Sequence, residues 1–337
     1  MIDSSRPARP LVRVTRKLLP ETEARMAELF DVVLNENDVP LSREGLAEAM
    51  RDCDVFVPTV TDHIDAELIA GAPERLRLIA NFGNGVDHID LSAARRRSIP
   101  VTNTPGVLSE DTADMTMALI ITVSRRFADG IRCVASGQWT GWGPSAMLGH
   151  RIGGKTLGIV GFGRIGTAVA QRARAFGLSI LYHRRHRLPP SIEEQLGVTF
   201  EPELDRLLQR ADIVSIHCPL TAETTKLINR DRIALMKPDS YLINTSRGEV
   251  VDEQALIEAL QQGRIGGAGL DVFQHEPAVD PRLLTLPNVI LLPHMGSATF
   301  EGRAAAGDKV ITNIRVWADG HRPPDQVLEG WNESPLG

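Results

Sequence analysis

The chain of 337 residues is poor in cysteine: it has three, and no two of them form a C-x-x-C pair. Cys53, Cys133 and Cys218 are too scattered to form the framework of a disulfide-rich fold. We therefore expect reduced thiols, a cytoplasmic location and no metal site.

Long hydrophobic runs are also absent. The longest apolar stretch, residues 115–123, contains threonines and is too short to span a bilayer. The first ten residues, MIDSSRPARP, lack the apolar core of a signal peptide. A net charge of -6 argues against a basic surface for nucleic acid. We expect a globular protein of two domains, or one large one, with neither a membrane nor a nucleic-acid partner.

Short apolar runs alternate with helical patterns in the first part of the chain. The runs are 11–16, 30–35, 54–59, 76–83 and 99–105. Between them, Leu46, Met50 and Cys53 mark one apolar helical face, with Ser42 as the expected N-cap. Strands that alternate with helices predict right-handed βαβ units and a parallel sheet.

This alternation stops at residues 109–139, which we interpret as one long helical segment. The glycine-rich stretch 141–154 then connects two domains. A second strand–helix series follows, with apolar runs at 155–161, 178–183, 212–218, 240–246, 267–273 and 289–294. The last helical segment, 301–320, comes after the second sheet is complete, so it can return to pack on the first domain.

A G-x-G-x-x-G pattern at Gly161, Gly163 and Gly166 follows an apolar strand and opens a helix. In that context the pattern indicates dinucleotide binding. Gly161 permits a tight turn, Gly163 lets the backbone approach a pyrophosphate, and Gly166 allows close packing of helix on strand. The free N–H groups at the start of the helix favour the phosphates. The alternative is a tight strand–helix turn without a ligand.

The second strand of this unit lacks the acid that NAD-binding units place at its end. Arg184, Arg185, His186 and Arg187 follow the strand, and the first acid beyond them is Glu193, which comes too late to bind the ribose. Arginine can hold a phosphate through two charge-assisted hydrogen bonds. We therefore predict NADP(H), with NAD(H) as the weaker alternative. Arg184 should stand where the acid would be, with Arg185 or Arg187 beside the phosphate. The other interpretation is a solvated basic turn.

An arginine, a carboxylate and a histidine follow three strands of the second series. Arg247, Glu276 and His294 should lie at the carboxyl edge of the sheet, where ligands of parallel sheets bind. Together they suit reduction of a 2-oxo acid. The arginine holds the carboxylate and polarises the carbonyl, the histidine donates the proton, and the glutamate orients the imidazole.

Several strings of the sequence resemble a known family. GIVGFGRIG, INTSRGEVVDE, GAGLDVFQHEP and LLPHMGSAT together resemble the D-isomer-specific 2-hydroxyacid dehydrogenases. NFGNGVDHIDL, GWGPSAMLG and ILYHRRHR are similar to its glyoxylate/hydroxypyruvate reductase branch. The resemblance covers the chain beyond the first ten residues. It implies NADPH-dependent reduction of glyoxylate and hydroxypyruvate to D-2-hydroxy acids by a homodimer, with Arg247, Glu276 and His294 as the catalytic residues.

The resemblance also implies further site residues. Besides the glycines and arginines above, the cofactor should be contacted by Thr112, Phe162, Arg164, Ile165, Cys218, Pro219, Thr245, Ser246, Arg247, Asp271, His294 and Gly296. Asp271 matches the acid that contacts the nicotinamide carboxamide. Asn84 and Gly85 belong to the loop whose backbone amides bind the substrate carboxylate. An ordinary strand-end turn is the alternative for that loop.

The resemblance implies two Rossmann-like or flavodoxin-like α/β domains with parallel sheets and a cleft between them. Residues 1–104 and 293–337 would form the substrate-binding domain, and residues 105–292 the NADP-binding domain. Trp139 and Trp142 would either pack in a dimer interface or shape the neighbouring substrate site, and helix 109–136 would contact the second copy.

The remaining histidines are alternatives to His294. His275 should be exposed in a loop, His217 should make a local bond to the backbone, and His88 could touch ligand. His183 and His186 receive no role.

Other activities are carried by the same scaffold. Glu276 argues against formate dehydrogenase, whose relatives carry Gln there, whereas phosphite oxidation or another D-2-hydroxyacid stays open. A dinucleotide-sensing corepressor is the non-catalytic alternative.

Overall fold

The chain forms two compact units, each built around its own parallel sheet. A computed structural model describes residues 9–328, of which 9–108 and 298–328 form the first unit and 109–297 the second. The expected boundaries, 104/105 and 292/293, lie a few residues from these. The two α/β units confirm the predicted fold class.

The second unit, 109–297, has a seven-stranded sheet in the order β12-β11-β10-β9-β6-β7-β8, with every pair parallel. Its strands are β6 (Thr156–Val160), β7 (Ser179–His183), β8 (Val198–Phe200), β9 (Ile213–Ile216), β10 (Tyr241–Asn244), β11 (Gly267–Leu270) and β12 (Val289–Leu291). Its helices are α5 (Ser109–Ser124), α6 (Phe127–Ala135), α7 (Arg164–Ala175), α8 (Pro190–Leu196), α9 (Leu204–Arg210), α10 (Arg230–Leu235), α11 (Glu253–Gln261) and α12 (Pro281–Thr285), with a 3-10 turn at Gly248–Val250. Most strand residues are fully buried because helices cover both faces.

The first unit has a five-stranded parallel sheet in the order β2-β1-β3-β4-β5. Its strands are β1 (Leu11–Val14), β2 (Asp31–Val33), β3 (Val55–Val57), β4 (Leu78–Ala80) and β5 (Val101–Thr102). Its helices are α1 (Pro20–Leu29), α2 (Arg43–Arg51), α3 (Ala66–Gly71), α4 (Leu91–Arg96) and α13 (Phe300–Ala318). Ser42 caps α2 by accepting the N–H of Gly45, as predicted.

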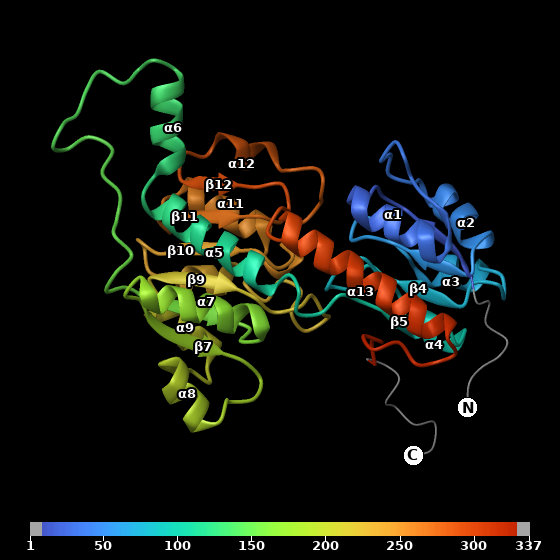
Figure 1. Ribbon diagram of the computed structural model, residues 1–337. Coiled ribbons are helices and arrows are strands. Elements are labelled where there is room, and N and C mark those ends of the chain that lie inside the picture. Colours follow the sequence, from blue (N-terminus) through green and yellow to red (C-terminus); the bar gives the residue numbers. More distant parts are fainter. Residues whose placement is uncertain (1–8, 329–337) are drawn as a thin grey trace. The chain divides into compact units, whose positions relative to one another are not determined.

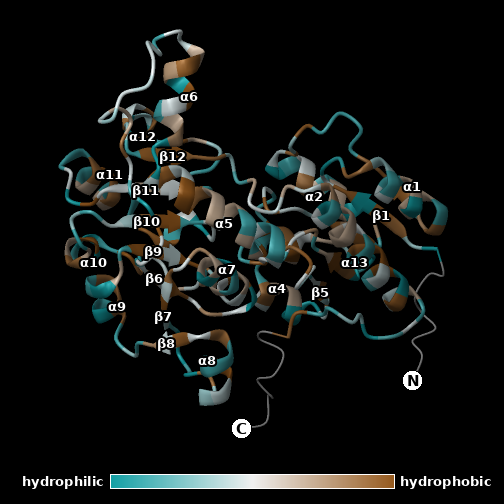
Figure 2. Ribbon diagram, turned by 60° about the vertical axis from the view of Figure 1, so that its left-hand side comes forward, coloured by the Kyte–Doolittle hydropathy of each residue, from teal (hydrophilic) through white to brown (hydrophobic). Residues whose placement is uncertain are grey.

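The helix α13 comes last in the chain and packs on the sheet of the first unit. Its buried residues Val310, Ile314 and Trp317 share one core with Val12 and Leu78. The helix therefore has a hydrophobic face and a hydrophilic face (Figure 2). In residues 9–328 no helix has the length and hydropathy needed to cross a membrane.

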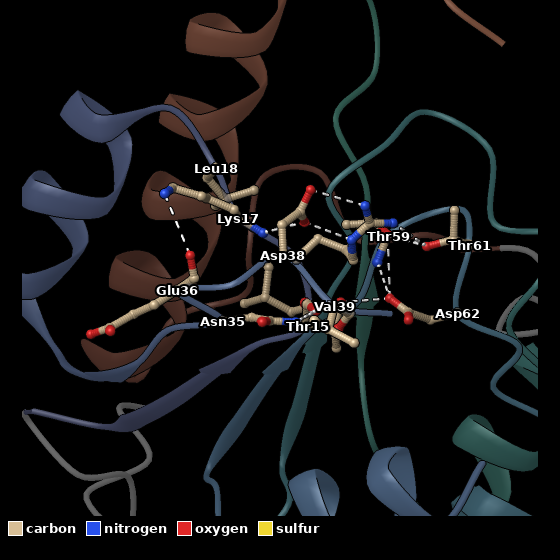
Figure 3. Close-up of polar contacts among 12 residues, drawn as sticks. Thr15, Lys17, Leu18, Asn35, Glu36, Asp38, Val39, Thr59, Thr61 and Asp62 are labelled. Carbon is tan, nitrogen blue, oxygen red and sulfur yellow. Dashed lines mark hydrogen bonds and ion pairs between the residues drawn. The ribbon is translucent and has the colours of Figure 1, made fainter. Parts of the chain in front are cut away.

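The carboxyl ends of β1 and β3 are joined by a buried polar cluster (Figure 3). Asp62 is 2% exposed, and its carboxylate accepts the Thr15 hydroxyl at 2.5 Å and the Thr59 amide at 2.8 Å. Close by, the Asn35 side-chain amide donates to the carbonyl oxygens of Thr15 and Val39, both at 2.7 Å. These bonds hold the loops at this edge of the sheet.

The expectation of one continuous helix over 109–139 is wrong. Helix α5 ends at Ser124, where the carbonyl oxygen accepts the backbone N–H of His150 at 2.8 Å. Arg126 then takes a left-handed conformation, with φ of 56°, before α6 begins. The segment around Gly149 packs so closely on the end of α5 that a side chain would not fit, because a Cβ on Gly149 would lie 2.6 Å from the Ser124 carbonyl oxygen.

Candidate functional site

The glycine loop between β6 and α7 has the geometry of a dinucleotide-binding turn. Gly161 has a φ of 87°, and a Cβ there would lie 2.5 Å from the backbone nitrogen of Cys218. A Cβ on Gly166 would lie 2.6 Å from the Gly161 oxygen. A Cβ on Gly163, in contrast, would meet no atom within 4 Å. The loop is therefore tight where it packs and open at Gly163, directly before the first turn of α7.

The predicted basic cluster follows β7. Arg184 is half-buried and its Nη1 donates to the Phe162 carbonyl oxygen at 3.3 Å, so this side chain lies against the glycine loop. Arg185 and His186 are exposed. The Nδ1 of His183 lies 3.1 Å from the Glu201 carbonyl oxygen.

Arg187 is held by Glu193, a contact that sequence reasoning missed. Its Nε and Nη2 donate to the two carboxylate oxygens of Glu193 at 3.0 and 2.8 Å. The same carboxylate accepts the Tyr182 hydroxyl at 2.6 Å. The hydrogen bonds from Arg187 and then Tyr182 lower the pKa of Glu193 below its ordinary value. Of the two arginines expected beside a phosphate, Arg187 is therefore bound by Glu193, whereas Arg185 is not.

Arg247, Glu276 and His294 come together at one edge of the larger sheet. They follow β10, β11 and β12, which are neighbours, so the carboxyl ends of these strands meet. The Nδ1 of His294 lies 2.7 Å from Oε2 of Glu276, and Oε1 of Glu276 accepts the Phe273 amide at 3.0 Å. About a third of each side chain in the pair is exposed, so the imidazole can meet a small ligand.

The carboxylate of Glu276 is kept ionised by its neighbours. Burial alone would raise its pKa, but the hydrogen bond and charge of His294, the Phe273 amide and the charge of Arg247 lower it below its ordinary value. Arg247 is near Glu276 because the next residue, Gly248, packs against the backbone of Phe273 and Gln274, just before Glu276 in the chain. A Cβ on Gly248 would be 2.0 Å from the Phe273 carbonyl carbon, so only glycine fits.

Asp271 holds the turn that carries His294. Its carboxylate oxygens accept the amides of Met295 and Gly296 at 2.8 and 2.7 Å, and its carbonyl oxygen accepts the His294 amide at 2.8 Å. These bonds stabilise the left-handed backbone of His294, which has a φ of 51°. Burial raises the pKa of Asp271, and the two backbone amides oppose that shift. The sequence indicated only a cofactor contact for this residue.

The other predicted cofactor residues lie near the same strand ends. Thr245 and Ser246 follow β10, and the Thr245 hydroxyl lies 3.0 Å from that of Thr116 in α5. A Cβ on Gly296 would be 3.7 Å from the methyl carbon of Thr112. Cys218 and Pro219 follow β9, and the backbone of Cys218 lies beside Gly161 of the glycine loop. Arg164 and Ile165 are the first two residues of α7.

The loop with Asn84 and Gly85 belongs to the first unit and follows β4. Asn84 is exposed and Gly85 half-buried. At the end of this loop His88 is buried, with Nε2 3.0 Å from the Asn81 side-chain oxygen, so it supports the loop from behind.

His217 and His275 differ in how well they were predicted. The expected backbone bond of His217 is wrong, because its Nε2 lies 2.7 Å from the Ser215 hydroxyl. Burial lowers the pKa of His217 to about 3, so its imidazole is neutral. His275 is exposed, as predicted.

The segment that follows α5 carries large exposed apolar side chains. None of the α6 residues is buried, and α6 and the following segment extend away from the sheet of their unit (Figure 1). The exposed fractions of Trp139 and Trp142 are 64% and 86%, and Ile131 and Val134 in α6 are exposed to a similar extent.

A glycine loop at the start of α7, with an arginine, a carboxylate and a histidine at the neighbouring strand ends, defines a dinucleotide-dependent oxidoreductase. Residues 117–296 match the sequence model described as the NAD binding domain of D-isomer specific 2-hydroxyacid dehydrogenases. The chain belongs to this family, which confirms the predicted resemblance.

Relatives and solved structures match nearly the whole chain. A glyoxylate reductase from Thermococcus litoralis is 45% identical over 324 residues, which are 95% of this chain and 97% of the relative. A structure from Thermus thermophilus has a TM-score of 0.88 at 43% identity and covers 94% of this chain and 99% of that one. An NADPH-dependent glyoxylate/hydroxypyruvate reductase from Sinorhizobium meliloti, solved with NADP and malonate, has a TM-score of 0.83 at 37% identity and covers 95% and 97%.

Proposed function

We propose that this protein reduces small 2-oxo acids, glyoxylate and hydroxypyruvate among them, to D-2-hydroxy acids with NADPH. The observation that carries the proposal is the 2.7 Å contact of His294 with Glu276, with the charge of Arg247 beside it. The relatives named glyoxylate reductase and the Sinorhizobium structure support the substrate class.

His294 is the proton donor of the proposed reaction. The ionised Glu276 accepts a hydrogen bond from Nδ1, which orients the imidazole and leaves Nε2 to face the substrate. The carbonyl oxygen of the substrate takes that proton and becomes the hydroxyl. Arg247 holds the substrate carboxylate and polarises the carbonyl. When bound, NADPH would supply the hydride for the carbonyl carbon.

The residues around the glycine loop fit a dinucleotide. The open side of Gly163 and the first N–H groups of α7 would receive the pyrophosphate. Arg184, which lies against the loop, and the exposed Arg185 would hold the 2′-phosphate of NADPH. Asp271 and Thr112, near Gly296, would line the nicotinamide half.

The backbone amides at Asn84 and Gly85 would take the substrate carboxylate. Glycines on either side of Asn84 leave the backbone accessible to an anion. The first unit, residues 9–108 and 298–328, would thus serve the substrate, and the second unit, residues 109–297, the cofactor.

Two measurements test this function. NADPH absorbance would be followed with glyoxylate, hydroxypyruvate, pyruvate and formate, and NADP⁺ reduction with phosphite. Turnover of the oxo acids is expected, and its absence with bound NADPH would refute the proposal. Arg184→Asp should weaken NADPH binding roughly tenfold to a hundredfold more than NADH binding, since charge-assisted hydrogen bonds are lost. The matched control is Arg206→Asp, an exposed arginine of α9 with the same charge change.

We also propose that a second copy of the chain covers the exposed face of α6. A row of large apolar side chains on an extended helix is typical of an interface. Light scattering should find a homodimer, and Ile131→Glu should shift it toward monomer. Leu284→Glu, an equally exposed leucine of α12, is the control. A monomeric wild-type protein would refute this assignment. If the wild type is a dimer, Trp139→Ala and Trp142→Ala separate packing in the interface from shaping of the substrate site.

A further inference from the structure

The loop of residues 83–85 has its three successive carbonyl oxygens bound by side-chain amides from outside it. Asn81 Nδ2 donates to the Gly83 oxygen at 3.1 Å and to the Gly85 oxygen at 2.9 Å. Asn103 Nδ2 donates to the Asn84 oxygen at 2.7 Å. Two asparagines therefore determine which way these peptide groups face.

In a trans peptide, the carbonyl of one residue and the N–H of the next point in opposite directions. With the carbonyls of Gly83, Asn84 and Gly85 turned toward the asparagine side chains, the following N–H groups turn away from them. Those N–H groups belong to Asn84, Gly85 and Val86. The N–H groups of Asn84 and Val86 thus turn away from Asn81, and that of Gly85 turns away from Asn103. Successive backbone N–H groups whose direction is fixed in this way can bind an anion.

The orientation of the Asn81 amide is itself fixed. Asn81 is fully buried, and its Oδ1 lies 3.0 Å from His88 Nε2. An amide oxygen can only accept, so His88 donates this bond and Nδ2 must face the loop carbonyls. His88 thus acts on the loop through Asn81.

Asn103 is fixed by the last part of the described chain. Its N–H donates to the Asp325 carbonyl oxygen at 3.3 Å, and its carbonyl oxygen accepts from Asn313 Nδ2 at 3.4 Å. Lys309 Nζ holds the Asp325 carboxylate at 2.9 Å. Helix α13 and the segment after it therefore support the loop from within the same unit.

We propose that Asn81 and Asn103 are positioning residues that aim the amides of Asn84, Gly85 and Val86 at the substrate carboxylate. The inference rests on the proposed function, which gives the loop its ligand. It predicts that removing either amide donor weakens carboxylate binding and leaves NADPH binding and the chemical step nearly unchanged.

The test compares Asn103→Ala and Asn103→Asp with wild type. Loss of one hydrogen bond should raise the KM for glyoxylate about three- to tenfold, with kcat within about twofold. Asn103→Asp should raise KM further, because its carboxylate would face the Asn84 carbonyl oxygen. The control is Asn35→Ala, which removes two bonds to backbone carbonyls of the same unit and should leave KM within about twofold.

Binding of oxalate to the NADPH-loaded protein, measured by calorimetry, separates this inference from the proposed reaction. A wild type that binds oxalate but reduces no oxo acid refutes the reaction alone, and weaker oxalate binding by Asn103→Ala then still supports the loop assignment. Unchanged oxalate affinity in Asn103→Ala overturns the inference, as does an equal rise in KM for Asn35→Ala. Asn81→Asp keeps the side-chain shape but lacks the amide donor, so it should also weaken oxalate binding and raise the KM for glyoxylate.

Discussion

The pairing of Glu276 with His294 yields the most direct test of the proposed chemistry, through Glu276→Gln. The carboxylate performs two tasks in the structure: one oxygen accepts the Phe273 amide and the other contacts His294 Nδ1. A glutamine has one oxygen, so it can perform only one of them. If it keeps the Phe273 bond, its NH₂ group faces the imidazole, and Nδ1 must then accept a hydrogen bond where it donates one in the wild type.

The expected size of the effect follows from this loss. A hydrogen bond to a charged group contributes about 1.5–3 kcal/mol. Since about a third of each side chain is exposed, the lower part of that range applies. About 1.5–2 kcal/mol corresponds to a roughly ten- to thirtyfold lower rate of reduction. Single-turnover reduction of glyoxylate with bound NADPH measures this step without product release.

The pH dependence of the reduction rate is a second test of the Glu276–His294 pair. His294 and its other neighbours lower the pKa of Glu276, despite burial, below the ordinary 4.5. The carboxylate therefore stays ionised at weakly acid pH. On the acid side, the wild-type rate of reduction should fall only below the ordinary pKa of 4.5. Stability follows the same sign: a lowered folded-state pKa stabilises the fold above the ordinary value, and this contribution is lost as the pH falls through the lowered one.

The control for Glu276→Gln is Glu253→Gln. Glu253 accepts the amide of Gln274 at 3.0 Å and so supports the same stretch of chain without a contact to the imidazole. A Glu276→Gln enzyme within about threefold of wild type would refute the reasoning. So would an equal loss in both variants, because the effect would then come from the loop and not from the charge.

Three further predictions concern stability. Asp271→Asn should lower the free energy of unfolding in urea by about 1.5–3 kcal/mol, since one of the two backbone amides bound by this carboxylate loses its acceptor; an unchanged value would contradict the role of Asp271 in holding the turn of His294. Gly248→Ala should cost about 3 kcal/mol, because its Cβ would overlap the Phe273 carbonyl, and a wild-type Tm would show that the turn can move. The desolvated, neutral imidazole of His217 should make the wild type lose about 2 kcal/mol between pH 7 and pH 5, because the unfolded histidine takes up a proton that the folded one does not. His217→Gln should remove that loss, and an identical slope in urea titrations would rule His217 out as its source.

The strands and the catalytic edge could be predicted because both follow from local sequence patterns. Fully buried parallel strands read as apolar runs, and the residues after each run are placed at one edge by the topology. The strand β8, Val198–Phe200, was missed because three residues with one exposed threonine are too short to show a pattern. The roles of Asn81 and Asn103 were missed as well, since bonds from side chains to loop carbonyls leave no spacing rule in the sequence.

The break between α5 and α6 shows a second limit. Residues 109–139 have helical composition throughout, and nothing local ends the helix at Ser124. The helix ends there because His150, distant in sequence, supplies the N–H that the Ser124 carbonyl accepts. A tertiary contact therefore decides a helix boundary, and the apolar residues of α6 become exposed instead of continuing a buried face.

Glu193 shows the same limit at the cofactor site. Counting along the chain placed this acid too far from β7 to matter, but α8 folds back and brings it to Tyr182 and Arg187. It does not replace the missing ribose ligand, because both of its oxygens are already occupied by these side chains. Glu193 binds Arg187 in an ion pair and so supports the turn that carries Arg184 and Arg185. The predicted preference for NADPH therefore depends on these two arginines, of which only Arg184 contacts the glycine loop through a hydrogen bond.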